Sequence, residues 1–165
     1  GFYKETARIP ELEAVLQQPF VIKQLNQSRS ETNVIRGFHA EDWNKLITVT
    51  SGYCFCTLLD VRPNSETFGQ FETFYLGTHA DALQGSLFVS RGIANSLCAI
   101  AGPVDYCYAV DALWAERDPA GDVAINIFDP DVQVEWPVSH EKLIFSERDA
   151  QSINLRDKFP EKFNR

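Results

Sequence analysis

The sequence predicts an all-β fold, a double-sheet jelly roll with short helices near its N- and C-terminal ends. Many short extended runs, separated by turn residues at even spacing, are typical of this architecture. Twelve Phe, five Tyr and three Trp against no Met indicate a core of stiff aromatic side chains, which suits packed sheets. With 165 residues and 44% hydrophobic content, the chain is long enough for one domain spanning residues 1–165.

The first part of the chain predicts a helix followed by a hairpin. Residues 10–18 carry Leu12, Val15 and Leu16 at helical spacing. After Phe20 the pattern changes to extended runs. Residues 46–60, interrupted by Ser51-Gly52, predict two strands joined by a tight turn.

The remainder predicts further strands and a short C-terminal helix. Ser146 is placed to cap that helix, with Asp149 in its first turn. Residues 117–122 read Arg-Asp-Pro-Ala-Gly-Asp, which is a loop pattern. The expected strands are residues 73–76, 86–89, 96–99, 106–110 and 132–136.

Charge and cysteine usage narrow the range of partners and compartments. A net charge of −8 argues against a general nucleic-acid or anionic-membrane surface, and an anionic ligand would need basic residues gathered locally. Cys54 and Cys56 alternate in an apolar run, and Cys98 and Cys107 also lie in apolar segments, so we expect buried free thiols. No C-x-x-C spacing supports a zinc site. Without a signal peptide or long apolar span, the expected location is the cytoplasm.

Three short motifs carry the chemical signal of this chain. The first is Arg36-Gly37-Phe38-His39, the second is Lys45-Leu46, and the third is Ser146-Glu147-Arg148-Asp149. Together they supply a base near neutral pKa, a carboxylate to hold it and a cation for an enolate. Those groups are the ones needed to remove a proton from carbon beside a carbonyl.

The ordered set of motifs resembles the dTDP-4-dehydrorhamnose 3,5-epimerase family, which consists of cupin-type enzymes of activated deoxysugar synthesis. The resemblance covers the chain almost end to end. Gly1-Phe2 is similar to the end of the family's R-G-F/Y segment, which leaves open an upstream piece with a strand and an arginine. The other matching pieces are Gln24-x-Asn26, Asn33 to His39, Lys45-Leu46, Asp60-Val61-Arg62, Ser65 to Gly69, Tyr106-Cys107-Tyr108, Asp129-Pro130, Glu135-Trp136-Pro137 and Ser146-x-x-Asp149.

The resemblance implies a role for each of four catalytic residues. His39 is the base that removes the C3 or C5 proton, and Asp149 holds its far ring nitrogen. Tyr108 is the general acid on the opposite face of the sugar, and Lys45 stands by the C4 oxygen where negative charge develops. Each of three residues also has a non-catalytic alternative. Asp149 could be a carboxylate that stabilises the start of a helix, and Lys45 could be a solvent-exposed residue at a strand edge. Tyr108 could be an ordinary core aromatic.

The resemblance also implies a second set of residues, which bind the substrate. Arginine forks donate paired hydrogen bonds to phosphate oxygens, and glycine at position 37 would let the backbone approach a ligand. Taken singly, each member of this polar set is also typical of an ordinary surface residue. The set around the diphosphate and sugar is Arg36, Gln24, Asn26 and Arg148, with Asn95 beside it.

Four residues at three sites depart from the family pattern. Asn95 stands where a second active-site histidine is usual, and an amide forms hydrogen bonds but does not titrate. Leu113-Trp114 replaces a tyrosine pair, and Cys56 replaces an aspartate. Asparagine at position 95 also resembles divergent members that act on other nucleotide-linked keto-sugars, including heptoses.

The resulting hypothesis is a metal-free, cofactor-free homodimeric epimerase of a nucleoside-diphosphate 4-keto-(deoxy)sugar. It inverts C3, C5 or both, in the synthesis of activated deoxysugars for surface polysaccharides such as lipopolysaccharide. A non-catalytic nucleotide-sugar-binding cupin is the alternative. A metal cupin is disfavoured because His39, His79 and His140 are isolated from one another in the sequence.

Overall fold

A computed structural model describes residues 1–163 of the chain and confirms the all-β jelly roll. Short helices lie in the N-terminal and C-terminal parts, as expected. In chain order the elements are α1 (Ile9–Leu16), β1 (Gln24–Ser30), β2 (Ile35–Ala40), β3 (Lys45–Asp60), β4 (Phe71–Gly77), β5 (Leu87–Val89), β6 (Ile93–Val110), η1 (Pro119–Gly121), β7 (Val123–Ala124), η2 (His140–Lys142), α2 (Glu147–Ala150), α3 (Leu155–Lys158) and η3 (Pro160–Lys162).

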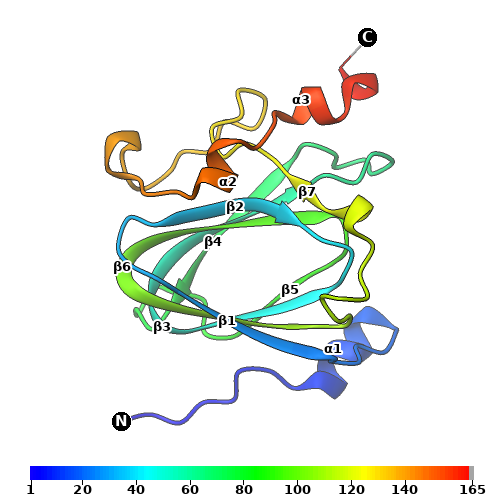
Figure 1. Ribbon diagram of the computed structural model, residues 1–165. Helices are drawn as coiled ribbons and strands as arrows, with labels where there is room; N and C mark the ends of the chain where they lie inside the picture. The colour runs from blue at the N-terminus through cyan, green and yellow to red at the C-terminus, as the bar shows by residue number, and fades with distance from the viewer. Residues whose placement is uncertain (164–165) are drawn as a thin grey trace.

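Two long antiparallel strands, β3 and β6, organise the sheets. They pair with each other along most of their length, and each also pairs with strands at both of its ends. At one end β4 lies beside β3 and β2 beside β6, with β7 at the edge; at the other end β1 pairs with β6 and β5 with β3. In Figure 1, β2 therefore lies in the layer opposite β1 and β5, and the sheets curl around a common interior.

The predicted hairpin over residues 46–60 is wrong, because the chain does not reverse at Ser51-Gly52. Gly52 has a φ of +79°, and the pairing register with β6 shifts around it. The glycine thus forms a bulge in a continuous strand rather than a turn. In the same way, residues 96–99 and 106–110 are parts of the single strand β6.

The predicted strand over residues 132–136 is also absent, and this segment is irregular. Gln133 has a φ of +53°, which interrupts an extended conformation. Val132 is buried, and the Trp136 indole packs on Phe38 and Phe55 while its Nε1 donates to the Ile127 carbonyl at 2.9 Å. The alternating pattern came from an irregular segment that packs on the sheet.

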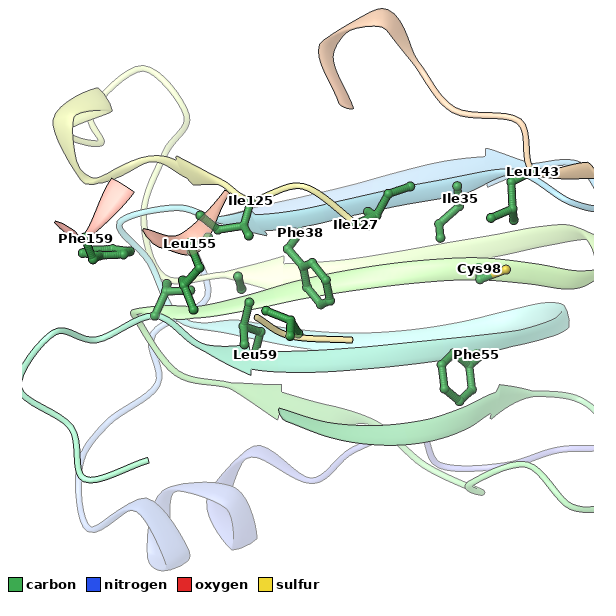
Figure 2. Packing of buried hydrophobic residues seen from close by; sticks show 14 residues of the cluster. Ile35, Phe38, Phe55, Leu59, Cys98, Ile125, Ile127, Leu143, Leu155 and Phe159 are labelled. Atoms are coloured by element: carbon green, nitrogen blue, oxygen red, sulfur yellow. The ribbon is translucent and has the colours of Figure 1, made fainter. Parts of the chain in front are cut away.

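The core has two main parts. One lies between the sheet and the C-terminal segments, and Figure 2 shows Phe38, Leu59 and Ile125 meeting there. The other fills the interior between the layers, where Cys54 and Cys56 pack with Leu97. Burial raises the pKa of Cys56 to about 12, which keeps it a thiol. All four cysteines are free, as expected from the sequence, although Cys107 is only half-buried.

Within residues 1–163, no helix combines the length and the apolar character needed to cross a bilayer.

Candidate active site

A cavity of about 290 Å³ opens beside the paired strands β3 and β6. It collects most of the polar residues that the sequence motifs single out, from segments far apart in the chain. Its lining consists of Ser28, Arg36, His39, Glu41, Lys45, Asn95, Leu97, Tyr106, Tyr108, Trp114 and Arg148.

His39 and Asp149 form a hydrogen-bonded pair at the wall of this cavity. His39 Nε2 lies 2.6 Å from Asp149 Oδ1, although 110 residues separate them in sequence. Asp149 is 3% exposed, and Ser146 Oγ donates to its Oδ2 at 2.9 Å. Burial would raise the pKa of Asp149, but the hydrogen bond and charge of His39, with Ser146 and the Gly37 N–H, lower it overall. In this pair, the ionised carboxylate of Asp149 fixes the orientation of the His39 imidazole.

The local backbone of β2 explains why Arg36 and His39 both reach the cavity. Residues three apart in a regular strand point to opposite faces. Here the register with β6 shifts between Arg36 and His39, and such an irregularity re-aims side chains. Arg36 is further fixed by its Nε, which donates to Ser30 Oγ at 3.0 Å.

Gly37, which lies within this irregularity, has a packing role that differs from the one inferred from the sequence. Its φ is +123°, and a Cβ at this position would lie 2.6 Å from Ser96 Cα. The glycine therefore allows the close approach of β2 to β6, whereas the sequence interpretation had assigned that freedom to ligand approach.

Lys45 begins β3 and is buried, so the solvent-exposed alternative is wrong. Its Nζ donates to Asn95 Oδ1 at 2.6 Å and lies 2.5 Å from Glu41 Oε2. The ammonium is also 5.8 Å from the centre of the Tyr108 ring. A buried ammonium with a carboxylate and an amide as partners keeps a fixed position in the cavity wall.

Tyr106 and Tyr108 alternate on β6 and both face the cavity, with ring centres 6.1 Å apart. Burial raises the pKa of Tyr108, and the charge of Glu41 raises it further, against a smaller opposing effect of Arg36. A phenol held neutral in this way can donate a proton at neutral pH. Tyr106 accepts a hydrogen bond from Asn95 Nδ2 at 3.1 Å, which makes Asn95 a bridge between Lys45 and Tyr106.

Gln24 and Asn26 lie next to the cavity without lining it. Gln24 Nε2 donates to Asn26 Oδ1 at 2.7 Å, and Asn26 is the register partner of Tyr108. Gln24 Oε1 accepts the backbone N–H of Trp114 at 2.9 Å. These two side chains thus support the wall that Trp114 forms.

Sequence reasoning missed Glu41, and it named Trp114 only as part of the pair that replaces the family's tyrosines. Glu41 lies two residues after His39, so strand alternation alone would have placed it on the same face. Trp114 lies in a loop, where no periodic pattern indicates the direction of a side chain.

Positively charged side chains are concentrated at the cavity, although the chain as a whole is acidic. Arg36, Lys45 and Arg148 all line the cavity, opposed there by Glu41. This supplies the local basic set that an anionic ligand would require.

The other two histidines have structural settings. His79 Nδ1 lies 2.9 Å from Asp81 at the surface, and His140 packs against Phe128. Over the described part of the chain, no three His, Cys, Asp or Glu residues come together as a metal-binding group.

Comparison with known proteins agrees with the motifs and the geometry. The family model described as dTDP-4-dehydrorhamnose 3,5-epimerase matches residues 1–157. The dTDP-4-dehydrorhamnose 3,5-epimerase of Escherichia coli (strain K12) is 30% identical over 161 residues, which cover 94% of this chain and 82% of that protein. The dTDP-4-dehydrorhamnose 3-epimerase of Streptomyces niveus is 27% identical, over 95% of this chain and 74% of its own length.

Solved structures show the same relationship. The dTDP-6-deoxy-D-glucose-3,5-epimerase of Legionella pneumophila Philadelphia 1, in complex with dTDP-4-keto-L-rhamnose, superposes with a TM-score of 0.83 at 26% identity. The match covers 98% of this chain and 84% of that one. The chain belongs to the dTDP-4-dehydrorhamnose 3,5-epimerase family, whose members are sugar-nucleotide epimerases.

Proposed function

We propose that this protein epimerises a dTDP-linked 4-keto-deoxysugar at C3, C5 or both. The observation that carries the proposal is the His39–Asp149 pair, 2.6 Å apart, at a cavity that Lys45 and Tyr108 also line. Base, enolate partner and acid are then within one site, which is the set that inversion beside a carbonyl requires.

Proton removal is the task of His39. The 4-keto group acidifies the neighbouring C–H, and the electron pair of that bond moves into the carbonyl to form an enolate. Asp149 holds the ring nitrogen that faces away from the substrate and stabilises the imidazolium that forms. The buried setting of Asp149 keeps this orientation fixed.

Lys45 stabilises the enolate oxygen at C4. Asn95 and Glu41 hold its ammonium, which leaves a donor for the developing negative charge. Tyr108 then delivers its proton to carbon from the opposite face, and inversion results. The resting state returns when Tyr108 regains a proton and His39 loses one.

Arg36 and Arg148 are proposed to hold the diphosphate, since both line the cavity and their forks suit phosphate oxygens. Gln24 and Asn26 are proposed to contact the substrate at the edge of the site, where they already support Trp114. Asn95 is proposed to contact the sugar as a neutral group.

Incubation in D2O with a panel of dTDP-linked 4-keto sugars tests the function directly. Deuterium at one carbon identifies a mono-epimerase, and deuterium at two carbons a di-epimerase. Binding without uptake for every member of the panel would contradict catalysis and favour the non-catalytic binder.

Replacing Tyr108 with phenylalanine should separate proton removal from inversion. His39 would still remove the proton, so deuterium should enter from the original face while the inverted product falls by about 10²-fold or more. Mass and chiral-product analysis read the two quantities separately. Tyr53→Phe, which changes a tyrosine outside the cavity, is the control. Inversion at the parent rate in Tyr108→Phe would assign the acid to another residue, with Tyr106 next in line.

Replacing Glu41 with glutamine should move the alkaline limb of the pH–rate profile to lower pH. Glu41 contributes to the raised pKa of Tyr108, after burial itself. Without that negative charge, Tyr108 loses its proton at lower pH and stops acting as an acid there. Inversion rates measured across the alkaline range provide the test, with Glu72→Gln on β4 as the control. An unmoved alkaline limb would separate Glu41 from the ionisation of the acid.

We further infer that the protein is a cytoplasmic homodimer. Phe2, Tyr3 and Leu25 are 76%, 92% and 76% exposed, and large apolar side chains left this exposed favour a protein partner. Figure 1 shows the N-terminal segment running along the outside, next to the β1 end of the molecule. Sedimentation should give a mass twice that of the 18.7 kDa chain, and Leu25→Asp should lower it. Buried free thiols support a reducing compartment.

A further inference from the structure

Trp114 combines high exposure with firm restraint. It lies in the irregular segment between β6 and η1, and 51% of it is exposed. Its backbone N–H is nevertheless bound to Gln24 Oε1, and its ring packs 5.8 Å from the ring of Trp43, which is buried. A large apolar ring held in place at a cavity wall is available for contact with a ligand.

The strongest restraint on Trp114 comes from Arg117. The guanidinium carbon lies 3.3 Å from the centre of the Trp114 ring, which is a close stacking contact. Arg117 is itself fixed, because Nη2 and Nε bind the two carboxylate oxygens of Asp122 at 2.5 and 3.2 Å. Its Nη1 donates to the Trp114 carbonyl at 2.9 Å. The arginine side chain is only 10% exposed, so it is committed to this arrangement.

One face of the indole is therefore covered by Arg117, while Trp114 still lines the cavity of His39, Lys45 and Tyr108. We propose that Trp114 is a stacking platform for the sugar ring of the nucleotide-sugar, and that Arg117 and Asp122 are positioning residues that hold it. This proposal rests on the proposed function, since it assigns a place to the sugar of that substrate.

The sugar is favoured over the nucleobase because Trp114 shares its cavity with His39, Lys45 and Tyr108, the groups proposed to act on the sugar. A pyranose ring presents a face of C–H groups, and a deoxysugar adds apolar surface. The negative face of an indole ring suits such a surface, and its pre-fixed orientation lowers the entropy lost on binding. The platform would decide which C–H meets His39, and a small misplacement of a reacting carbon costs on the order of 10²-fold in rate.

Intrinsic tryptophan fluorescence of the full chain can test the platform without any turnover. The ligand is dTDP-quinovose, a deoxysugar nucleotide with no keto group, and dTDP alone is the comparison. Trp114→Phe should remove the fluorescence change caused by dTDP-quinovose, whereas Trp136→Phe, in the core, should keep it. Trp114→Ala should weaken the binding of dTDP-quinovose by on the order of tenfold and leave the affinity for dTDP unchanged.

Kinetics on a 4-keto substrate give a second readout. Trp114→Ala should lower kcat by on the order of 10²-fold. Arg117→Lys removes the planar guanidinium group that stacks on Trp114 and pairs with Asp122, so this substitution should also lower kcat. Arg156→Lys is the matched control, since Arg156 forms a similar pair with Asp131 away from the cavity.

Two results would overturn the proposal. One is an equal loss of affinity for dTDP and for dTDP-quinovose in Trp114→Ala, which would mean that the nucleobase, and not the sugar, stacks on the Trp114 ring. The other is unchanged sugar binding and fluorescence in both Trp114→Ala and Arg117→Lys. If the native protein turns over no 4-keto sugar, the proposed function fails, but the titrations still decide the platform. If Trp114→Ala does not fold, Trp114→Phe and Arg117→Lys give the same decision.

Discussion

His39→Asn should abolish deuterium exchange into the substrate while leaving nucleotide affinity nearly unchanged. The imidazole acts on carbon, whereas the phosphates are assigned to Arg36 and Arg148. Loss of a general base costs about 10²–10⁴-fold in rate. Asparagine keeps a polar group beside Asp149, so the buried carboxylate is not left without a partner.

The control for this change is His79→Asn. His79 also contacts a carboxylate, at 2.9 Å from Asp81, but its side chain is 65% exposed at the surface. Exchange measured by mass spectrometry should be at the parent rate in this control. Parent-rate exchange in a folded His39→Asn protein would remove His39 from the mechanism.

Gly37→Ala should cause the largest loss of stability among the changes considered. A Cβ at this position would lie 2.6 Å from both Ser96 Cα and Cβ and 2.8 Å from the Asn95 carbonyl oxygen, so backbone must shift. Overpacking costs about 1–3 kcal/mol, and a φ of +123°, which L side chains rarely adopt, adds about 1–3 kcal/mol. The free energy of unfolding should therefore fall by about 3 kcal/mol, and His39 should move away from the cavity with β2.

Denaturant titration measures this change, with Gly85→Ala as its partner experiment. A Cβ on Gly85 meets nothing within 4 Å, so that substitution should leave the unfolding midpoint nearly unchanged. Equal stability in Gly37→Ala and Gly85→Ala would mean that β2 and β6 need no close approach.

The sequence was sufficient for the fold class but not for the continuity of the strands. Turn residues such as Ser51-Gly52 mark a change of backbone direction, and a bulge uses the same residues as a hairpin. Only the partner strand decides between them, and β6 pairs with both halves of β3. Alternation over residues 132–136 likewise reflected packing on the sheet, which an irregular segment can also achieve.

The candidate site could be predicted where its residues lie in ordered motifs. His39, Lys45, Tyr108 and Arg148 meet in one cavity, and Asp149 lies behind His39. The resemblance marked Trp114 only as part of a replaced tyrosine pair, and the direction of its side chain could not be predicted, because it depends on Arg117, whose contacts form only in the folded loop.

The passage of β3 and β6 through both layers of the seven-stranded sheet has a consequence for cooperativity. Neither layer can separate without breaking the β3–β6 ladder that also holds the other, so these strands form one cooperative unit. Lys45, Asn95 and Tyr108 are all carried on this pair. Their amide hydrogens should exchange with solvent only through global unfolding, and these three side chains should keep their positions on heating until the whole molecule melts.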